Sequence, residues 1–453
     1  MGGKHDITPA IDPAVERLQR LIRIPTVSWA DRDRIDPEPF HAFARQLAAD
    51  FPLLHSHLEK TVINDHGMLF HWRGHSDDRP VVLMAHIDVV PVDEGDTWQH
   101  PAFGAEIHDG VLWGRGTLDD KGCLAGICEA VERLLEQDFT PDQDIWLSFG
   151  CDEEVMGQAA PTAVEVLRER GVEPWFVLDE GGAVAYDAFP GVKPPLAVIG
   201  VTEKGITNVQ LSVEGRGGHA SMPAPMDTTA RLARAVLRLD ANPFPSSVPP
   251  PTVEMFRRIA DRLPMPLRPV LSPVLKNVDK LKPLLARVLV AAGPESAAMT
   301  RTTTVVTTLS GSPANNVIAS RATAGVNVRI MTGDTVAGVV ERMTSVINDD
   351  AVAVSVVDSN EPSPLSPVDD DAFRLIESAV SEVFADAVPT PYVMMGATDS
   401  RFFTAICERV YRFAPFRMTK AQRESIHSYD ERIGVNDYLD GIAFYQRLIE
   451  AIR

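Results

Sequence analysis

Two side chains suited to binding metal or moving protons stand directly after a short apolar run of this chain. His86 and Asp88 follow the segment 81–85 (VVLMA). In an open α/β sheet, ligands gather beyond the carboxyl ends of the strands. An imidazole and a carboxylate two residues apart at such an end can therefore face one site. By itself His-x-Asp is a weak signal, because chance matches to it are common.

Acidic residues occupy the same kind of position twice more. Glu153 and Glu154 follow the apolar run 145–149 (IWLSF). Asp179 ends the run FVLD, shortly before two glycines. Taken singly, adjacent glutamates are typical of a solvated face, and an aspartate before glycines is typical of a turn. Their common place at predicted strand ends favours one shared site.

Two further segments carry side chains of the same kinds. In 114–122 (GRGTLDDKG), two glycines allow the backbone to bend, and Asp119 precedes a predicted helix. The segment lacks the Gly-Lys-Ser/Thr of a phosphate-binding loop, and its simplest interpretation is an acidic helix cap. His427 stands in ESIHSYDER near the C-terminus. Taken alone, it would be interpreted as a structural histidine.

Together, two imidazoles and several carboxylates are the ligand chemistry of a two-metal zinc site. Zinc takes imidazole and carboxylate ligands at about 2.0–2.2 Å. One carboxylate can bridge two ions about 3.5–4 Å apart, and such a pair lowers the pKa of water to about 7. A further carboxylate that is not a ligand can take and return the proton. The pattern therefore predicts hydrolytic chemistry.

The other histidines lack this context. His55 and His57 have a ligand-like spacing, but no carboxylate cluster accompanies them. His100 and His108 lie between the first two motifs. We expect His100 and His108 to be structural and not to bind metal.

The elements that must position these residues alternate between strand and helix patterns. Segments 14–23, 40–50 and 122–137 show apolar residues at helical spacing. The apolar runs that carry the acidic and imidazole side chains lie between and after them. Such alternation predicts an α/β sheet that is covered by helices on its faces.

From about residue 203 the pattern changes to strand, helix, strand, strand, helix, strand. The segments are 206–213, 227–239, 302–309, 322–330, 334–347 and 351–357. This is the order of a ferredoxin-like α+β domain. A Pro-rich insertion at about 243–300 interrupts the order, and we expect the cluster of prolines at 243–273 to mark an irregular stretch.

A helix pattern at 371–384 then resumes the α/β pattern. We therefore predict an α/β, mixed-sheet catalytic domain formed by residues 1–202 and 362–453. An inserted ferredoxin-like domain, residues 203–361, would interrupt it.

The composition fits a globular protein and disfavours several classes of partner. The chain has 453 residues, and its 43 basic and 63 acidic side chains give a formal charge of −20. This excess of acid disfavours binding to nucleic acid or to an anionic membrane surface. We find no apolar run of transmembrane length, no secretory signal and no Cys-x-x-Cys pair. We therefore expect a cytoplasmic protein without disulfides.

The ordered motifs resemble the zinc-dependent acetylornithine deacetylase / succinyl-diaminopimelate desuccinylase / carboxypeptidase family, which also contains the aminoacylases. The resemblance extends from about Leu18 to the C-terminus. It rests on AHIDVVP (85–91), the segment 98–122, DEE (152–154), VLDEGG (177–182), GRGGHASMP (215–223), NNVIAS (315–320), GATDSR (396–401) and HSYDERI (427–433). The motifs VLDEGG, TDSRFF and VYRFAPF most resemble the branch with carboxypeptidase S and the N-acyl-amino-acid hydrolases.

The resemblance implies a set of metal ligands. His86 and Asp179 would bind the first zinc, Glu154 and His427 would bind the second, and Asp119 would bridge the two. The implied cofactor is a pair of divalent ions per chain, with zinc expected and cobalt or manganese able to replace it.

Two further residues would serve the reaction beside the metals. Glu153 would be the general base. Asp88 would hold the other ring nitrogen of His86 and thereby fix the tautomer of that ligand.

The resemblance also implies that the inserted domain is a lid and a homodimer contact. His219 would stabilise the oxyanion, from its own chain or from the partner. Asn316 and Arg329 would bind the substrate's carboxylate, for which arginine offers two parallel hydrogen bonds. Gly396 and Thr398 would line the substrate site from the catalytic domain.

Two departures from the family pattern accompany these assignments. The lid motif has Ala319 where proline is usual, and Asp179 stands where many deacetylases have glutamate.

These features predict a metal-dependent hydrolase of an amide bond beside a free carboxylate. The substrate would be a dipeptide or small peptide, or an N-acyl amino acid, and the sequence does not choose between them. One alternative is a catalytically silent homologue that binds small molecules. Another is a protein with one metal or a structural metal, which metal content per chain would distinguish.

Overall fold

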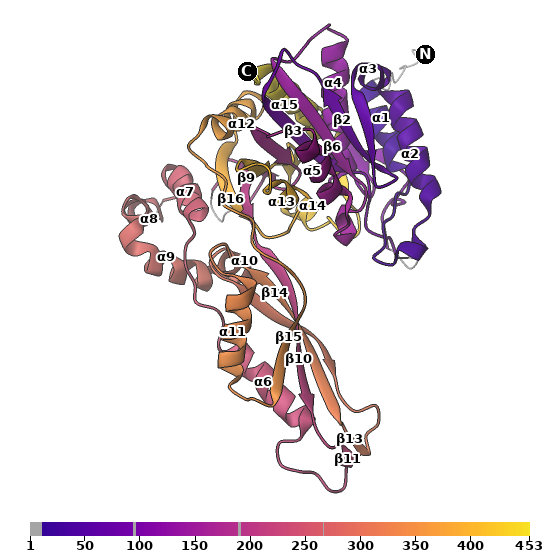
Figure 1. Ribbon diagram of the computed structural model, residues 1–453. Helices are drawn as coiled ribbons and strands as arrows, with labels where there is room; N and C mark the ends of the chain where they lie inside the picture. The colour runs from indigo at the N-terminus through magenta and orange to yellow at the C-terminus, as the bar shows by residue number, and fades with distance from the viewer. Residues whose placement is uncertain (1–10, 94–96, 189–191, 266) are drawn as a thin grey trace, which may run out of the picture. The chain divides into compact units, whose positions relative to one another are not determined.

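The computed structural model describes residues 11–93, 97–188, 192–265 and 267–453 (Figure 1). The chain divides into two compact units. The first comprises the residues up to Gly200, Ser366–Thr390 and Thr398–Arg453, and the second comprises Val201–Leu365 and Pro391–Ala397. The sequence-based division did not assign Pro391–Ala397 to the inserted unit. None of the described helices combines the length and the apolar character needed to cross a bilayer.

A ten-stranded mixed sheet is the centre of the first unit, as the α/β pattern predicted. Its order is β1-β2-β6-β3-β7-β17-β9-β8-β18, and β16 pairs with β9. The bounds are β1 (Glu59–Ile63), β2 (Gly67–Trp72), β3 (Ser76–His86), β6 (Gln143–Gly150), β7 (Phe176–Asp179), β8 (Ala183–Ala185), β9 (Leu196–Glu203), β16 (Val388–Met394), β17 (Val410–Arg412) and β18 (Arg417–Met418).

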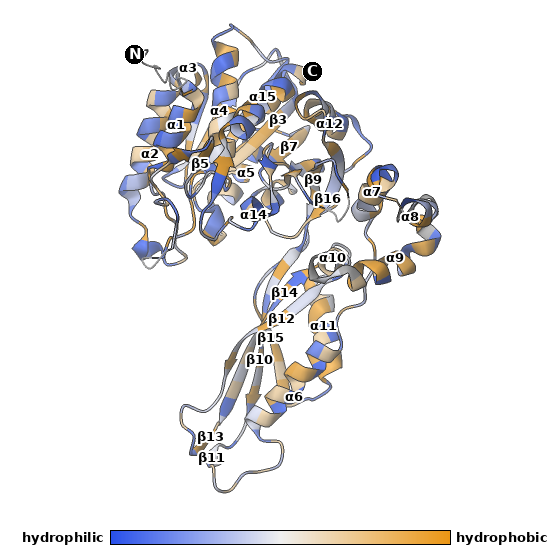
Figure 2. Cartoon of the chain, turned by 180° about the vertical axis from the view of Figure 1, so that it is seen from behind, coloured by the Kyte–Doolittle hydropathy of each residue, from blue (hydrophilic) through white to orange (hydrophobic). Residues whose placement is uncertain are grey.

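Strands β6, β3 and β7 run parallel and lie side by side. Residues 81–85 of β3 are all buried, and Figure 2 draws this strand in the orange of hydrophobic residues. A continuous apolar run is what a parallel strand needs when both of its faces are covered. The carboxyl ends of the three strands therefore meet at one edge of the sheet.

Helices pack on this sheet in two groups. Helix α4 (Lys121–Leu135) contacts β3, α1 (Pro13–Ile22) and α15 (Val435–Ala451), whereas α5 (Ala159–Glu169) contacts β6. The connections β3-α4-β6 and β6-α5-β7 cross the sheet in opposite directions. Right-handed crossovers therefore place α4 and α5 on opposite faces.

Further helices and a small sheet complete the first unit. They are α2 (Pro37–Asp50), α3 (Pro52–His57), α12 (Asp371–Val383), α13 (Ser400–Phe403), α14 (Lys420–Arg423), and a small sheet in the order β19-β5-β4 with β4 (Glu106–His108), β5 (Val111–Trp113) and β19 (Arg432–Gly434).

Helix α1 illustrates how local sequence sets these elements. The Asp12 carboxylate accepts a hydrogen bond of 2.9 Å from the backbone amide of Ala14, and Pro13 occupies the first helical position. An acidic cap and a proline at this position both favour a helix start. The buried residues Val15, Leu18 and Leu21 form the stripe that faces the core.

The second unit has the predicted ferredoxin-like topology. Its four-stranded antiparallel sheet has the order β12-β14-β10-β15. Helices α6 and α11 contact each other and the sheet. The bounds are β10 (Gly205–Glu214), α6 (Thr228–Ala241), β12 (Thr303–Ser310), β14 (Arg321–Ile330), α11 (Val336–Ile347) and β15 (Val352–Asn360), with a separate ribbon of β11 (Gly218–His219) and β13 (Val317–Ile318).

The core of this unit follows the period-two pattern of a sheet with one covered face. Val209, Leu211 and Val213 alternate along β10 and are buried. They pack with Leu232 of α6 and Met343 of α11 in one hydrophobic cluster. This burial holds the two helices on one face of the sheet.

The prediction of an irregular stretch at 243–273 was wrong, because the described part of the insertion 243–300 is mainly helical. It contains α7 (Pro250–Ile259), α8 (Leu267–Lys276), α9 (Val278–Ala292) and α10 (Pro294–Ala298). Proline lacks a backbone donor, but the first turn of a helix needs none. Pro250 and Pro251 occupy that turn of α7. Prolines thus stand at the starts of α7 and α10, whereas Pro273 and Pro283 lie inside α8 and α9.

Candidate metal centre and active site

The site lies where the parallel strands β6, β3 and β7 end. His86 is the last residue of β3. Glu153 and Glu154 begin a short 3-10 turn after β6, and Asp179 ends β7. Strand order reverses on either side of β3, so these ends border the crevice in which α/β folds bind ligands.

Two groups of metal-ligating side chains share Asp119. One group is His86, Asp119 and Glu180, and the other is Asp119, Glu154 and His427; within each, the ligand atoms lie within 4.8 Å of one another. Oδ1 of Asp119 is 2.9 Å from Nε2 of His86, and its Oδ2 is 2.9 Å from Nε2 of His427. One carboxylate thus faces two separate imidazoles with its two oxygens, as a bridging ligand must.

The acidic groups of the cluster lack enough positive charge among their described neighbours. Hydrogen bonds with Asp119 and Glu154 raise the pKa of His427 to about 10. Burial raises the pKa of Glu154, and the nearby Asp119 raises it further. Glu154 Oε1 is buried and has no hydrogen-bond partner among the described residues. Buried polar atoms are normally paired, so converging carboxylates with an unpaired oxygen fit a site for divalent cations.

The first-metal group contains Glu180, whereas the sequence predicted Asp179. Asp179 Oδ1 accepts a hydrogen bond from the backbone amide of Glu180, and Oδ2 accepts one from that of Ser400, both at 2.9 Å. Its carboxylate is thus engaged by the backbone at the strand end. The next residue, Glu180, points toward His86 and Asp119. The two adjacent acids of VLDEGG therefore give two assignments, Asp179 from the sequence and Glu180 from the geometry, and the ligand role of Asp179 stays a prediction.

Asp88 contacts both the ligand His86 and the turn that carries Glu153 and Glu154. Nδ1 of His86 lies 3.0 Å from the backbone carbonyl of Asp88 and 3.3 Å from Oδ1 of its carboxylate. The ring therefore donates from Nδ1 and keeps the Nε2 lone pair for a metal. The same carboxylate accepts hydrogen bonds from the Ser28 hydroxyl and from the backbone amides of Glu153 and Glu154.

Glu431 positions the loop that carries Asp119. It is fully buried, and its Oε1 accepts hydrogen bonds of 3.1, 2.8 and 3.1 Å from the backbone amides of Gly116, Leu118 and Asp119. Arg115 pairs with its Oε2 at 2.7 Å. Glu431 belongs to the motif HSYDERI, but its role leaves no local pattern in the sequence, because its backbone partners lie so far away along the chain.

The buried acid Asp120 contacts the backbone of the ligand His86. The peptide bond between Asp119 and Asp120 is cis, and Oδ2 of Asp120 accepts a hydrogen bond of 3.2 Å from the backbone amide of His86. Asp120 was quoted in the motif but was not assigned a role. It links the loop after β5 to the end of β3.

Glu153 belongs to neither ligand group. Burial raises the pKa of its carboxyl well above the ordinary value, and nearby Asp399 and Glu154 act in the same direction. A raised pKa suits a group that exchanges protons near neutral pH. Asp399 is itself buried, and burial together with Asp179 raises its pKa to about 8. Asp399 belongs to the motif GATDSR, for which only Gly396 and Thr398 were predicted to have a role.

His219 and Asn316 lie together in the second unit. His219 pairs with Val317 in the β11–β13 ribbon, and the backbone carbonyl of Asn316 accepts a hydrogen bond from the amide of Ala220. The backbone amide of Ser221 donates to Nδ1 of His219. In the neutral ring Nδ1 is therefore the acceptor, and Nε2 carries the proton. Both predicted residues are exposed.

Arg329 lies in a cationic part of the second unit. Burial lowers the pKa of its guanidinium, and among the described residues no carboxylate forms an ion pair with it. Burial, Arg329 and Arg301 together lower the pKa of Lys204 to about 8. Positive charge that is half-buried without an acidic partner is suited to bind an anion.

Gly396 and Thr398 fall in different units. Gly396 is exposed, and a Cβ atom there would meet open space. Thr398 is buried, with its hydroxyl 2.6 Å from that of Ser400. Their role in lining the substrate site stays a prediction.

Comparison with known proteins gives concordant matches over nearly the whole chain. Residues 82–451 match the model of Peptidase family M20/M25/M40. The N-fatty-acyl-amino acid synthase/hydrolase PM20D1 of Xenopus tropicalis is 35% identical over 442 residues, which cover 96% of this chain and 85% of the relative. The Homo sapiens protein of that name is 34% identical, with coverages of 96% and 87%.

A solved structure shares the fold. The M20 family metallo-carboxypeptidase Sso-CP2 from Sulfolobus solfataricus aligns with a TM-score of 0.69 at 17% identity. The alignment covers 98% of this chain and 99% of that one.

Proposed function

The chain belongs to peptidase family M20/M25/M40 and is a metal-dependent hydrolase; from this premise we propose that it cleaves the amide bond of N-acyl amino acids. The observation that carries metal-dependent hydrolysis is the sharing of Asp119 between two ligand groups, with the carboxylate of Glu153 close enough to feel the charges of Glu154 and Asp119. This arrangement suits a pair of metal ions and a separate proton acceptor. The choice of N-acyl amino acids is supported by the similarity to the PM20D1 relatives.

The metal pair would be held by the five side chains that form the two groups: His86, Asp119, Glu180, Glu154 and His427. When bound, the pair supplies positive charge that lowers the pKa of water and polarises the amide carbonyl. We propose zinc because the ligands are imidazoles and carboxylates. Cobalt or manganese suits the same set.

Glu153 would move the proton. Its carboxylate would accept a proton from the attacking water and then deliver it to the amide nitrogen as the carbon–nitrogen bond breaks. The hydrogen bond from its backbone amide to Asp88 holds Glu153 in place for both transfers. The raised pKa of Glu153 makes its carboxylate a stronger base for taking the proton from water.

His219 would stabilise the negative charge that develops on the carbonyl oxygen. With Nδ1 accepting from Ser221, Nε2 is the available donor. A donor aimed at a developing oxyanion stabilises the transition state more than the ground state.

Arg329 would bind the free carboxylate of the substrate, with Asn316 as a polar neighbour. The guanidinium is half-buried and lies near Lys204, which in turn lies near Arg301. A carboxylate would neutralise part of this charge with charge-assisted hydrogen bonds. Cleavage would thus be restricted to amides next to a free carboxylate.

We propose a homodimer formed through the second unit. Its edge strands carry exposed apolar side chains, with Val305 at 56% and Leu309 at 68% exposure on β12, and Val356 at 42% and Val357 at 66% on β15. Exposed edges and apolar patches are typical of contact surfaces. A second copy of the chain would cover this face.

The cytoplasm stays our proposed compartment. Cys123, Cys128, Cys151 and Cys407 are all buried and unpaired. Free thiols are typical of reducing compartments.

A hydrolysis screen tests the substrate class. N-acyl amino acids of increasing chain length, dipeptides, and the carboxamides of both are offered to the zinc-loaded protein. We expect kcat/KM for N-acyl amino acids to exceed that for dipeptides by at least about tenfold, and the carboxamides to be poor substrates. Faster cleavage of dipeptides would contradict the N-acyl assignment and favour a dipeptidase.

A further inference from the structure

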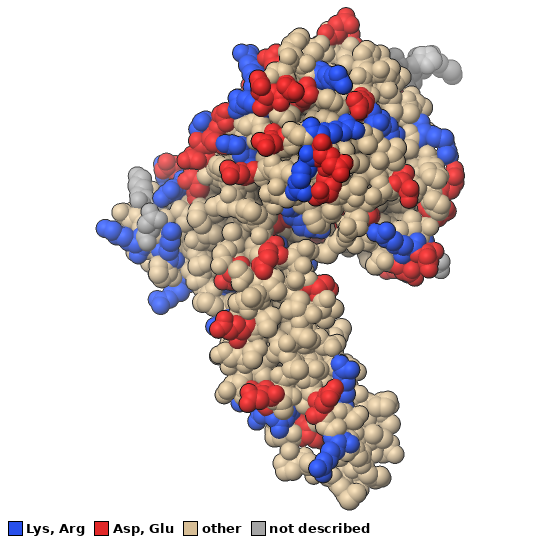
Figure 3. Space-filling model, viewed as in Figure 1, with Lys and Arg blue, Asp and Glu red and all other residues tan. Residues whose placement is uncertain are grey.

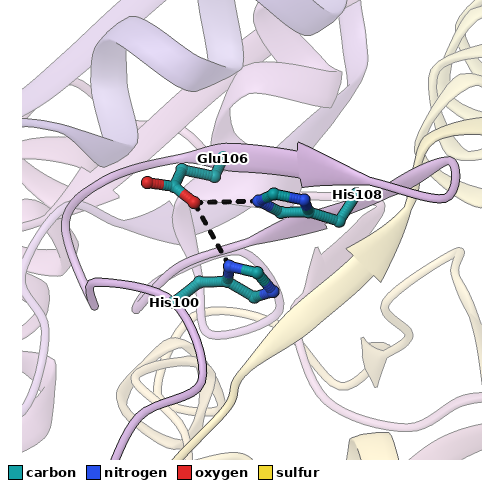
Figure 4. Close-up of side chains that lie close together, drawn as sticks. All are labelled: His100, Glu106 and His108. Atoms are coloured by element: carbon teal, nitrogen blue, oxygen red, sulfur yellow. Dashed lines mark hydrogen bonds and ion pairs between the residues drawn. The ribbon is translucent and has the colours of Figure 1, made fainter.

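Three metal-ligating side chains gather outside the catalytic centre, at the hairpin of β4 and β5. His100 precedes the hairpin, and Glu106 and His108 stand two residues apart on β4 (Figure 4). Their ligand atoms lie within 4.8 Å of one another. None of the three belongs to the groups around Asp119.

Two ring nitrogens converge on one carboxylate oxygen of this cluster. Nε2 of His108 lies 2.8 Å and Nδ1 of His100 lies 3.2 Å from the same Oε2 of Glu106 (Figure 4). The two imidazoles stack, with ring centroids 3.9 Å apart and planes 17° apart. A cation near this point would meet both imidazoles and the carboxylate after a small shift of the glutamate.

The hairpin that carries Glu106 and His108 has a tight, regular turn. His108 pairs with Val111 across the two-residue turn Asp109–Gly110, whose residues have φ of 50° and 75°. Positive φ at both positions is the signature of a tight hairpin turn that matches strand twist. Because Glu106 and His108 lie two positions apart on β4, their side chains share one face.

The segment that carries His100 is also fixed. The ring of His100 packs on Trp113, with centroids 4.8 Å apart. At the preceding residue, Gln99 hydrogen-bonds Asp430 through its backbone amide at 2.7 Å and its side-chain amide at 2.9 Å. The third side chain is thus held against the hairpin before any ion binds, which reduces the ordering cost of binding.

We propose that His100, Glu106 and His108 form a third metal site, which takes a borderline transition dication such as Zn²⁺ or Cu²⁺. Two imidazoles and one carboxylate are a known ligand set for such ions, with solvent able to complete the coordination. Mg²⁺ and Ca²⁺ prefer oxygen ligands, and this cluster offers one carboxylate. The expectation that His100 and His108 are only structural is revised accordingly.

The solvent exposure of the three side chains determines how readily a bound ion would exchange. The side chains of His100, Glu106 and His108 are all partly exposed, at 23%, 44% and 48%. The catalytic groups combine the exposed His427, at 53%, with the buried His86 and Glu154, at 2% and 3%. The outer ion therefore exchanges readily with solvent. Its binding strengthens as pH rises, because protons compete with the metal for the same nitrogens.

Metal stoichiometry tests the proposal. The full-length protein is equilibrated by dialysis against a series of free Zn²⁺ concentrations, and zinc per chain is measured. We expect a third equivalent that binds more weakly than the first two. The variant His100→Gln/His108→Gln should lose this equivalent alone, and His57→Gln, an exposed histidine elsewhere, should keep it. Saturation at two per chain, or a third equivalent that survives the double substitution, would overturn the site.

A local optical readout separates binding at this site from binding elsewhere. Trp113 packs on His100, so Cu²⁺ bound there should quench its fluorescence. We expect the quenching by added Cu²⁺ to fall in Trp113→Phe and in the double histidine variant, and to persist in His57→Gln. Equal quenching in all four proteins would place the copper elsewhere and contradict the proposal. Unchanged hydrolysis by the double variant would show that it remains folded.

Discussion

The backbone amide of Glu153 donates a hydrogen bond of 3.2 Å to the carboxylate of Asp88. Asp88 is completely buried and also contacts the Nδ1 side of His86. One acid thus fixes the orientation of an imidazole ligand and the position of the proposed proton acceptor. The ligand and the base follow different strands, β3 and β6, so this contact joins two ends of the sheet.

This contact predicts the effect of Asp88→Asn. The substitution places an amide nitrogen, a donor, where one carboxylate oxygen accepts from the backbone amides of Glu153 and Glu154 or from the Ser28 hydroxyl. Two donors would then face each other, and a hydrogen bond would be lost. We expect metal affinity or kcat/KM to fall by about 10- to 100-fold. Chelator competition and steady-state kinetics measure the two quantities. Asp144→Asn is a matched control, since Asp144 is a buried acid that bonds His71 and Gly74. Equal losses in both variants would indicate general destabilisation.

Substitutions of Asp179 and of Glu180 test which of these two neighbouring acids binds the first metal. Glu180→Gln should lower the metal content of the purified chain, because the ligand group loses a carboxylate. Asp179→Asn should keep both ions, since Asp179 accepts backbone hydrogen bonds. Metal analysis of both variants decides between them. Loss of an ion from Asp179→Asn alone would support Asp179, the ligand assigned from the sequence, and contradict Glu180.

The periodicity of apolar residues predicted most of the strands and helices of the fold. The apolar run 81–85 identified β3, and the alternating segments after residue 203 identified the ferredoxin-like sheet, because these patterns report burial directly. The choice between Asp179 and Glu180 depends instead on the backbone path after β7. Gly181 and Gly182 there have φ of 89° and 71°, and the sequence does not state which acid such a turn directs inward.

The supporting contacts were harder to predict than the ligands. Glu431 meets Gly116 and Asp119 across a separation of more than three hundred residues. No local pattern encodes such a partner. Resemblance to a family identifies the ligand motifs, whereas the hydrogen bonds that hold them emerge only from the folded chain.

Arg329→Ala tests recognition of the substrate carboxylate. A charged hydrogen bond of roughly 1.5–3 kcal/mol corresponds to about a 10- to 100-fold rise in KM. We expect this rise for acids and little change for their carboxamides. Arg321→Ala, on an exposed position of the same strand, is the control. Equal effects on acid and carboxamide would remove Arg329 from the binding site.

Mixing two inactive chains tests whether His219 acts across a dimer. Glu153→Gln and His219→Ala chains are unfolded together, refolded and assayed. If His219 serves the partner's site, hybrid dimers contain one intact site, and activity should recover to about a quarter of wild type. Separately refolded chains are the control. No recovery, with a dimer present by light scattering, would show that His219 acts within its own chain.

The most direct test of the central claim is Glu153→Gln, with metal content and turnover measured on the same sample. Glutamine keeps the shape of the side chain and removes its basicity. We predict metal content equal to wild type and a loss of turnover of at least about 100-fold, whereas Glu154→Gln should lose metal as well. Turnover within about tenfold of wild type in the metal-loaded Glu153→Gln protein would contradict the assignment of Glu153 as the proton acceptor.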